Sequence, residues 1–103
     1  MTCSNRSFDS QQLIVSLRLD APGEVEKILL STQTSKGGDT LYKYQIGTQQ
    51  TVRLQCPQKG EGTVQICVFT KQDTICSDQL YVEPGYRPLL KMEGKQLKVL
   101  RNF

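Results

Sequence analysis

The sequence predicts an all-β fold, a small antiparallel β-sandwich with two disulfides. The prediction follows from segments in which apolar and polar residues alternate, from Gly- and Pro-rich turn sequences between them, and from an even set of four cysteines in 103 residues. Alternation with a period of two places every second side chain on one face of a pleated strand. Short strands separated by such turns are typical of sandwiches and barrels. We expect a single domain over residues 1–103, because domains most often have about 100–150 residues.

The alternating segments mark the expected strands, which cover residues 11–19, 25–32, 40–47, 51–56 and 63–82. The last segment folds back as a hairpin around residues 70–73, and the strand at 51–56 is expected to pair with residues 63–70. Residues 25–32 also fit a short helical turn, since Ile28-Leu29-Leu30 is continuous, and we take the strand. Tyr42, Tyr44 and Ile46 share one strand face, which we expect to be core or half-core.

The four cysteines are best explained by two disulfides. Their spacing contains no C-x2-C element and the chain has no histidine, so a structural zinc site and free buried cysteines are weaker alternatives. In the expected hairpin Cys67 lies directly opposite Cys76, where Cα atoms about 4.5 Å apart suit a disulfide. The expected neighbouring strand would place Cys56 roughly 13 Å from Cys67. We therefore favour Cys67–Cys76 together with Cys3–Cys56.

Paired cysteines indicate an oxidising compartment. Asn5 adds a weak signal, because Asn5-Arg6-Ser7 is an N-glycosylation acceptor triplet. No apolar run reaches the ~18 residues of a transmembrane helix, and the first residues lack the basic-then-apolar pattern of a secretion signal. We expect an extracellular or secreted protein, and the excised ectodomain of a larger chain fits the same pattern.

Positive charge is concentrated after residue 86. Residues 1–86 carry eight basic and nine acidic side chains, whereas residues 87–103 carry five basic side chains and Glu93 alone. The candidate anion-binding residues are these five, Arg87, Lys91, Lys95, Lys98 and Arg101. Such a tail suits weak, salt-sensitive contact with a sulfated glycan or another anionic surface. It also suits a solvated sheet edge, which lysines protect from aggregation, and we favour that interpretation.

The same tail has two expected conformations. Residues 89–92 and 96–100 fit a hairpin over Glu93-Gly94, whereas Leu97, Leu100 and Phe103 fit the apolar side of a short basic helix. We prefer the hairpin, because an isolated helix needs about 12–15 residues. On an extended strand Lys95, Lys98 and Arg101 would alternate between faces.

Catalysis and cofactor binding find little support in the sequence. Without histidine, a Ser/His/Asp or Cys/His nucleophile cannot be assembled, and no pair of carboxylates converges. The glycine clusters fit turns rather than phosphate-binding loops, and no calcium-loop motif occurs. The basic tail lacks the interleaved aromatics that stack nucleic-acid bases. We expect no catalytic residue, metal, cofactor or nucleic-acid partner.

Across the whole chain the strand and turn pattern resembles immunoglobulin-like or macroglobulin-like extracellular sandwich domains. Immunoglobulin domains proper have a Trp after the first core Cys and a Tyr two residues before the second. This chain has no Trp, and Thr74 stands two residues before Cys76.

Two functional hypotheses are favoured. The first is a non-enzymatic extracellular module, or a small secreted ligand, that binds a protein partner through a strand face or edge. The second is a secreted inhibitor or effector that blocks a target enzyme with an exposed loop, such as residues 57–62 or 70–73. An intracellular adaptor with reduced cysteines is a third, less favoured hypothesis.

Overall fold

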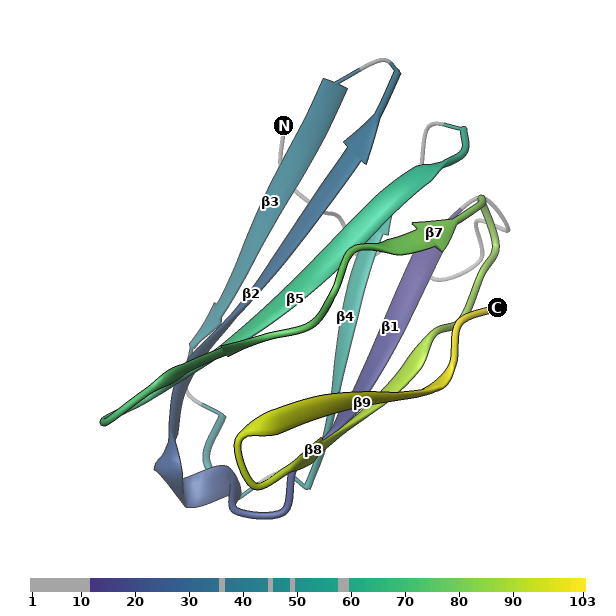
Figure 1. The fold of residues 1–103 in the computed structure, drawn as a ribbon. Helices are drawn as coiled ribbons and strands as arrows, with labels where there is room; N and C mark the ends of the chain where they lie inside the picture. Colours follow the sequence, from purple (N-terminus) through teal and green to yellow (C-terminus); the bar gives the residue numbers. More distant parts are fainter. Residues whose placement is uncertain (1–11, 36, 45, 49, 58–59) are drawn as a thin grey trace.

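The computed structural model describes residues 12–35, 37–44, 46–48, 50–57 and 60–103. Two predicted sites, the Cys3 half of a disulfide and the glycan acceptor Asn5, lie outside these residues. The elements of the described chain are β1 (Gln12–Arg18), η1 (Pro22–Glu24), β2 (Val25–Thr34), β3 (Gly37–Tyr44), β4 (Thr51–Pro57), β5 (Gly62–Thr70), β6 (Thr74–Cys76), β7 (Leu80–Val82), β8 (Leu89–Glu93) and β9 (Gln96–Arg101). The prediction of an all-β fold is confirmed (Figure 1). With one three-residue 3-10 helix, the described part of the chain has no helix that could span a bilayer.

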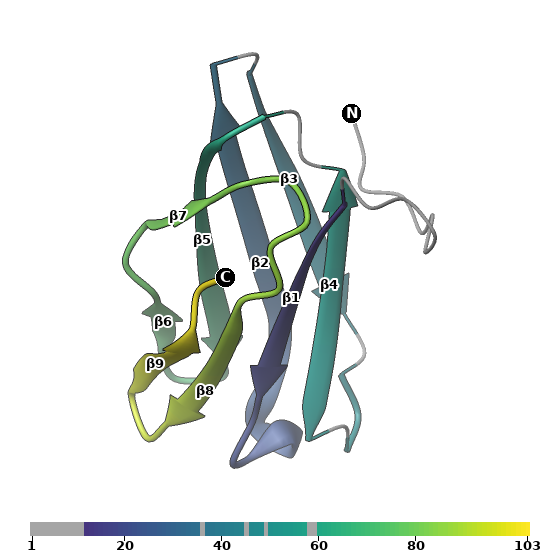
Figure 2. The ribbon, with the colours of Figure 1, turned by 90° about the vertical axis from the view of Figure 1, so that its right-hand side faces the viewer.

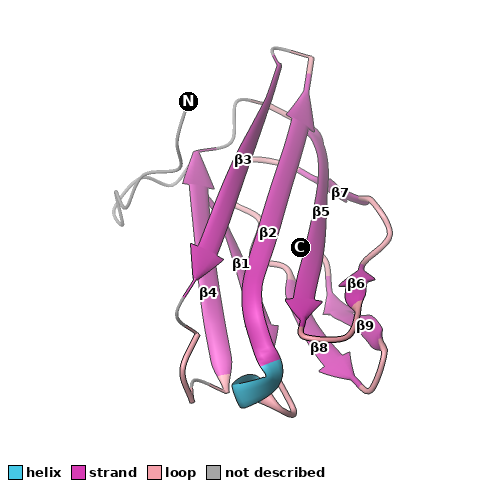
Figure 3. Cartoon of the chain, turned by 90° about the vertical axis from the view of Figure 1, so that its left-hand side faces the viewer, coloured by secondary structure: helices cyan, strands magenta, loops and turns pink. Residues whose placement is uncertain are grey.

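The strands form two sheets. One has four strands in the order β4-β1-β8-β9, and the other has five, with β3-β2-β5-β6 in order and β7 paired to β5. Figure 2 shows β4, β1, β8 and β9 in front of β3, β2 and β5, and Figure 3 shows the five-stranded sheet from the opposite side.

The core lies between the sheets and takes every second residue from each long strand. In β1 these residues are Leu13, Val15 and Leu17, each fully buried, and in β2 they are Ile28 and Leu30. Val25, at the start of β2, also belongs to the core. The other strands, and the segments next to the strands, contribute Leu19, Ile46, Val52, Leu54, Cys56, Val64, Ile66, Val68, Ile75, Val82, Leu90 and Met92. Burial of each such side chain stabilises the fold by about 1.5–3 kcal/mol.

The expected pairing of residues 51–56 with residues 63–70 is wrong. β4 pairs with β1, so that Cys56 lies beside Leu13, and β5 pairs with β2. The chain therefore changes sheet before and after β4, since β3 and β5 belong to the five-stranded sheet. As a member of the four-stranded sheet, β4 contributes its apolar side to the core. The sheet is also not purely antiparallel as expected, since β1 and β8 run parallel.

The expectation for Tyr42 and Tyr44 is also wrong, since both side chains are exposed. β3 pairs with β2 such that Leu41 and Lys43 lie beside the buried Leu30 and Ile28. The tyrosines therefore point outward, because paired residues project on the same side of a sheet.

Two hairpins form as expected. β5 and β6 pair with Cys67 opposite Cys76, as the turn at residues 70–73 predicts. β8 and β9 form an antiparallel hairpin instead of the alternative helix. The turn of this second hairpin is fastened twice, by the Lys95 Nζ–Asp73 Oδ2 ion pair at 3.5 Å and by the Gly94 N–H, which donates to Asp20 Oδ2 at 3.2 Å.

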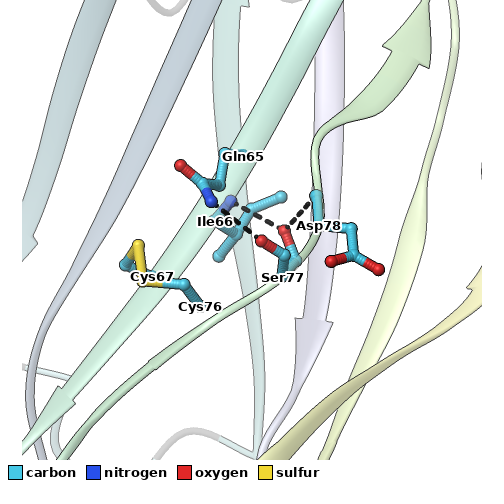
Figure 4. Close-up of a disulfide and its surroundings, with 6 residues drawn as sticks. All are labelled: Gln65, Ile66, Cys67, Cys76, Ser77 and Asp78. Atoms are coloured by element: carbon cyan, nitrogen blue, oxygen red, sulfur yellow. Dashed lines mark hydrogen bonds between the residues drawn. A yellow bond between two sulfur atoms is a disulfide. The ribbon is translucent and has the colours of Figure 1, made fainter.

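In the segment that links β6 to β7, Ser77 binds the neighbouring strand β5 through hydrogen bonds (Figure 4). Its backbone N–H donates to the Ile66 carbonyl at 2.8 Å, and its hydroxyl accepts the Ile66 N–H at 3.1 Å. The same hydroxyl donates to the Asp78 carbonyl at 2.8 Å, and Gln65 Nε2 donates to the Ser77 carbonyl at 2.9 Å. The buried side chain of Ser77 thus replaces a ladder bond that the chain loses where β6 ends.

Replacing Ser77 with Ala should lower the free energy of unfolding by about 1–3 kcal/mol, because the buried Ile66 N–H loses its acceptor. Urea denaturation measures the change. The control is Ser35→Ala in the exposed β2–β3 turn, which should shift stability by less than about 0.5 kcal/mol. Equal effects of the two substitutions would contradict this role of Ser77.

Candidate functional site

The outer side of the five-stranded sheet carries a cluster of aromatic and apolar side chains. We call it the aromatic face, and it consists of Lys27, Leu29, Tyr42, Tyr44 and Phe69. The strand register brings these residues together: Lys27 pairs with Tyr44 on one side and Phe69 on the other, and Leu29 pairs with Tyr42. They occupy two adjacent rows across β3, β2 and β5.

Within the aromatic face, the rings lie close to one another and to one cation. The Tyr42 and Tyr44 rings stack with centroids 6.2 Å apart. Lys27 Nζ lies 5.3 Å from the Tyr42 centroid and 4.7 Å from the Phe69 centroid, within cation–π range. Tyr42 and Tyr44 are nevertheless 48% and 59% exposed. The result is an accessible aromatic surface with a positive charge at its centre.

The predicted Cys67–Cys76 disulfide is present and borders the aromatic face. Figure 4 shows the Cys67–Cys76 bridge. Cys67 pairs with Leu29 across the sheet, so the bridge continues the row of Tyr42 and Leu29 onto β6. It fastens the short strand β6 to β5 and gives this side of the sheet a rigid border. Cys56 is fully buried and disulfide-bonded, and its predicted pairing with Cys3 stays a prediction, because Cys3 lies outside the described residues.

The predicted anion-binding residues separate into three locations. Lys91, Lys98 and Arg101 lie on the outer side of the four-stranded sheet, Lys95 lies in the β8–β9 turn, and Arg87 precedes β8. Lys98 and Arg101 share a face, although a strict alternation places them on opposite ones. A register shift between Leu89 and Leu90 pairs Leu89 with Arg101 and causes this difference.

Sequence reasoning missed two cations on the same surface, Arg18 of β1 and Arg53 of β4. The parallel pairing of β1 with β8 places Arg18 beside Lys91, and the pairing of β1 with β4 places Arg53 beside Ser16. Both arginines occupy polar positions of alternating segments, which signals an outward direction. The alternation of polar and apolar residues does not show which strands are neighbours.

Two tyrosines bind carboxylates where β7 pairs with β5: Tyr81 lies in β7, and Tyr86 follows it. Tyr81 Oη donates to Glu61 Oε2 at 2.8 Å, Tyr86 Oη donates to Glu83 Oε2 at 3.1 Å, and the two rings meet edge to face at 6.4 Å. The hydrogen bond to Glu61 raises the pKa of Tyr81 well above its ordinary value, and partial desolvation raises it further. The bond to Glu83 likewise raises the pKa of Tyr86.

Among the described residues, no three Cys, Asp or Glu side chains gather as metal ligands. A hollow that is open to solvent lies beside the β5–β6 turn, lined by Glu24, Thr70, Lys71 and Gln72. A second open hollow, on the outer side of the five-stranded sheet, is lined by Ser31, Thr32, Gln33, Thr63, Gln65 and Gln79. The first hollow therefore has one carboxylate and one amine in its lining, and the second has only uncharged polar side chains.

The chain matches no protein-family model, no curated protein sequence and no solved structure.

Replacing Cys67 and Cys76 together with Ala should lower the free energy of unfolding by about 2–3 kcal/mol, the chain-entropy value for a loop of this length. Chemical denaturation measures the loss. The native protein should also show no thiol that reacts with a labelling reagent at either cysteine. Labelling of Cys67 or Cys76 without denaturant would contradict the disulfide.

Glu61→Gln should lower the pKa of Tyr81 toward its ordinary value of about 10, because the charged acceptor is lost. A phenol whose pKa is raised by folding contributes stability below pH ~10 and loses it as pH rises further, since the unfolded chain releases its proton first. Tyrosinate absorbance during a pH titration measures the shift. Glu93→Gln, on the other sheet, is the control and should leave the titration unchanged.

Proposed function

We propose that this chain is a non-enzymatic, extracellular, disulfide-stabilised β-sandwich domain, immunoglobulin-like or macroglobulin-like in general pattern, that binds a protein partner through its aromatic face. The observation that carries the proposal is the stacked, exposed pair Tyr42 and Tyr44. Tyrosine is enriched at protein interfaces and among the residues that contribute most to binding, since its ring is large and rigid and has a polar tip.

Binding through the face is favoured over binding through an edge. β3 is an edge strand, and its Lys43 lies on the core-facing side beside Ile28. An inward-pointing charge on an edge strand opposes the addition of another strand. At one edge of the four-stranded sheet, β9 carries Lys98 and Arg101, and such charges also oppose edge pairing.

The chemistry of the aromatic face indicates what the partner surface offers. Tyr42, Leu29 and Phe69 suit apolar contacts, and the hydroxyls of Tyr42 and Tyr44 suit hydrogen bonds at the border of a buried patch. Lys27, between two rings, suits a carboxylate of the partner. The disulfide at the border supports an extracellular location, because such bonds persist in oxidising compartments.

The alternative, a secreted inhibitor that inserts a loop into an enzyme, is supported by the β5–β6 turn. Thr70 Oγ1 accepts the Asp73 N–H at 2.9 Å and the Gln72 N–H at 3.3 Å, and the Thr70 N–H donates to the Asp73 carbonyl at 2.8 Å. Such a braced turn is pre-organised, which lowers the entropic cost of insertion. The other loop considered, residues 57–62, lies partly outside the described residues.

The double substitution Tyr42→Ala/Tyr44→Ala should weaken partner binding about 30-fold, the effect of losing about 2 kcal/mol at the centre of an interface. Titration of fluorescent protein onto cells of the source organism, with competition by unlabelled protein, measures the affinity. Tyr81→Ala is the matched control, because Tyr81 is 47% exposed on the same sheet but distant from the aromatic face.

Equal affinities of the Tyr42/Tyr44 and Tyr81 variants, or no saturable binding, would contradict the proposal. Circular dichroism confirms that each variant is folded. Loss of binding in Lys71→Ala/Gln72→Ala, with retention in the Tyr42/Tyr44 variant, would favour the loop alternative.

A further inference from the structure

We infer that the outer side of the four-stranded sheet is a binding site for a sulfated polysaccharide chain. Five cations form this basic face: Arg18, Arg53, Lys91, Lys98 and Arg101. They come from all four strands of the sheet, and three of the five belong to the tail after residue 86. The site is thus assembled from both halves of the sequence by strand pairing.

The register arranges the cations in two neighbouring rows. Arg18 pairs with Lys91, and Lys91 pairs with Lys98, so three positive side chains follow one another across β1, β8 and β9. Neighbouring strands lie about 4.8 Å apart. Arg53 and Arg101 lie in the next row, that of Ser16 and Leu89. Ser16 and Leu89 are each two residues from Arg18 and Lys91, whereas the register shift puts Arg101 three residues from Lys98.

Positive charge on the basic face is only partly compensated. Lys91 Nζ lies 3.6 Å from Glu93 Oε1, and Glu93 is the acidic residue of this face in the described chain. Arg101 is held in place by its Nε and Nη2 groups, which donate to the Arg87 carbonyl at 3.2 and 3.0 Å. These two bonds involve two of the five N–H donors of its guanidinium.

Such crowding of like charges has no benefit for folding. Like charges directly opposite each other on a sheet destabilise it, and neighbouring rows lie within the Debye length of about 8 Å at physiological ionic strength. A row of anionic groups laid across the strands removes this repulsion and releases the counterions that the face holds. Charge complementarity therefore indicates a linear polyanion as the occupant.

The structure favours a sulfated polysaccharide over other polyanions. The described residues of this face include no aromatic side chain on which a nucleic-acid base could stack. Anionic lipids face the cytoplasm, whereas the Cys67–Cys76 disulfide belongs to an oxidising compartment. Arginine also presents paired N–H donors to the oxygens of an oxyanion.

The basic face is not the same set of residues as the basic tail after residue 86. Lys95 lies in the β8–β9 turn, outside the basic face, and forms an ion pair with Asp73 of the β5–β6 turn. Arg18 and Arg53, from the body of the chain, take part instead. The site is also separate from the aromatic face, which belongs to the other sheet, so that each can be tested without the other.

The test compares Arg18→Gln/Lys98→Gln with the matched variant Lys71→Gln/Lys95→Gln, which removes two turn cations. Isothermal titration with a short heparin oligosaccharide measures affinity at several salt concentrations. We expect the first variant to bind about 30-fold more weakly, at roughly fivefold per cation, with a shallower dependence on salt. The matched variant and Tyr42→Ala/Tyr44→Ala should bind like the native protein.

Stability provides a second measurement, since removing crowded cations should leave the melting temperature unchanged or raise it. Equal loss of heparin affinity in both charge variants would show attraction by net charge alone and overturn the inference. Phosphatidylserine vesicles and single-stranded DNA serve as comparison ligands. Tighter binding of either one, lost in Arg18→Gln/Lys98→Gln, would also overturn the inference.

Discussion

β1, β2 and β5 bury one side chain of every two in a common core, and this burial determines what the two outer surfaces carry. Leu17, Ile28 and Ile66 are each fully buried, and a slip of one residue in any of these strands would exchange its core side for its outer side. Burial of the apolar side therefore holds the register. With the register held, Arg18 on β1 and Lys27 on β2 have to face solvent.

The two outer surfaces consequently have different characters on opposite sheets. The five-stranded sheet presents stacked tyrosines around Lys27, with a disulfide at their border. The four-stranded sheet presents rows of cations that include Lys91 and Lys98. A domain with two such surfaces is suited to hold a protein on one side and an anionic chain on the other.

Much of the fold was predictable, because alternation and turn sequences act locally. Alternating segments located β1, β4 and β5, and the turn at residues 70–73 predicted the opposition of Cys67 and Cys76. A hairpin links neighbours in sequence, so its register follows from the position of its turn. The candidate surfaces were predictable only in part: Lys91, Lys98 and Arg101 were visible as a basic tail, whereas the exposure of the tyrosines was not.

The sequence by itself determined that the chain makes strands, which residues within a strand share a side, and which hairpins close. Only the tertiary structure decided which strands are neighbours and which side faces the core. Alternation does not say which side of a strand is buried, so the sequence wrongly favoured Tyr42 for the core, whereas the pairing of β3 with β2 places Leu41 on the core side. Likewise, Arg53 joined the tail cations only because β4 and β8 both pair with β1. Pairing between distant strands depends on the burial of whole sheet faces, and no local pattern in the chain contains that information.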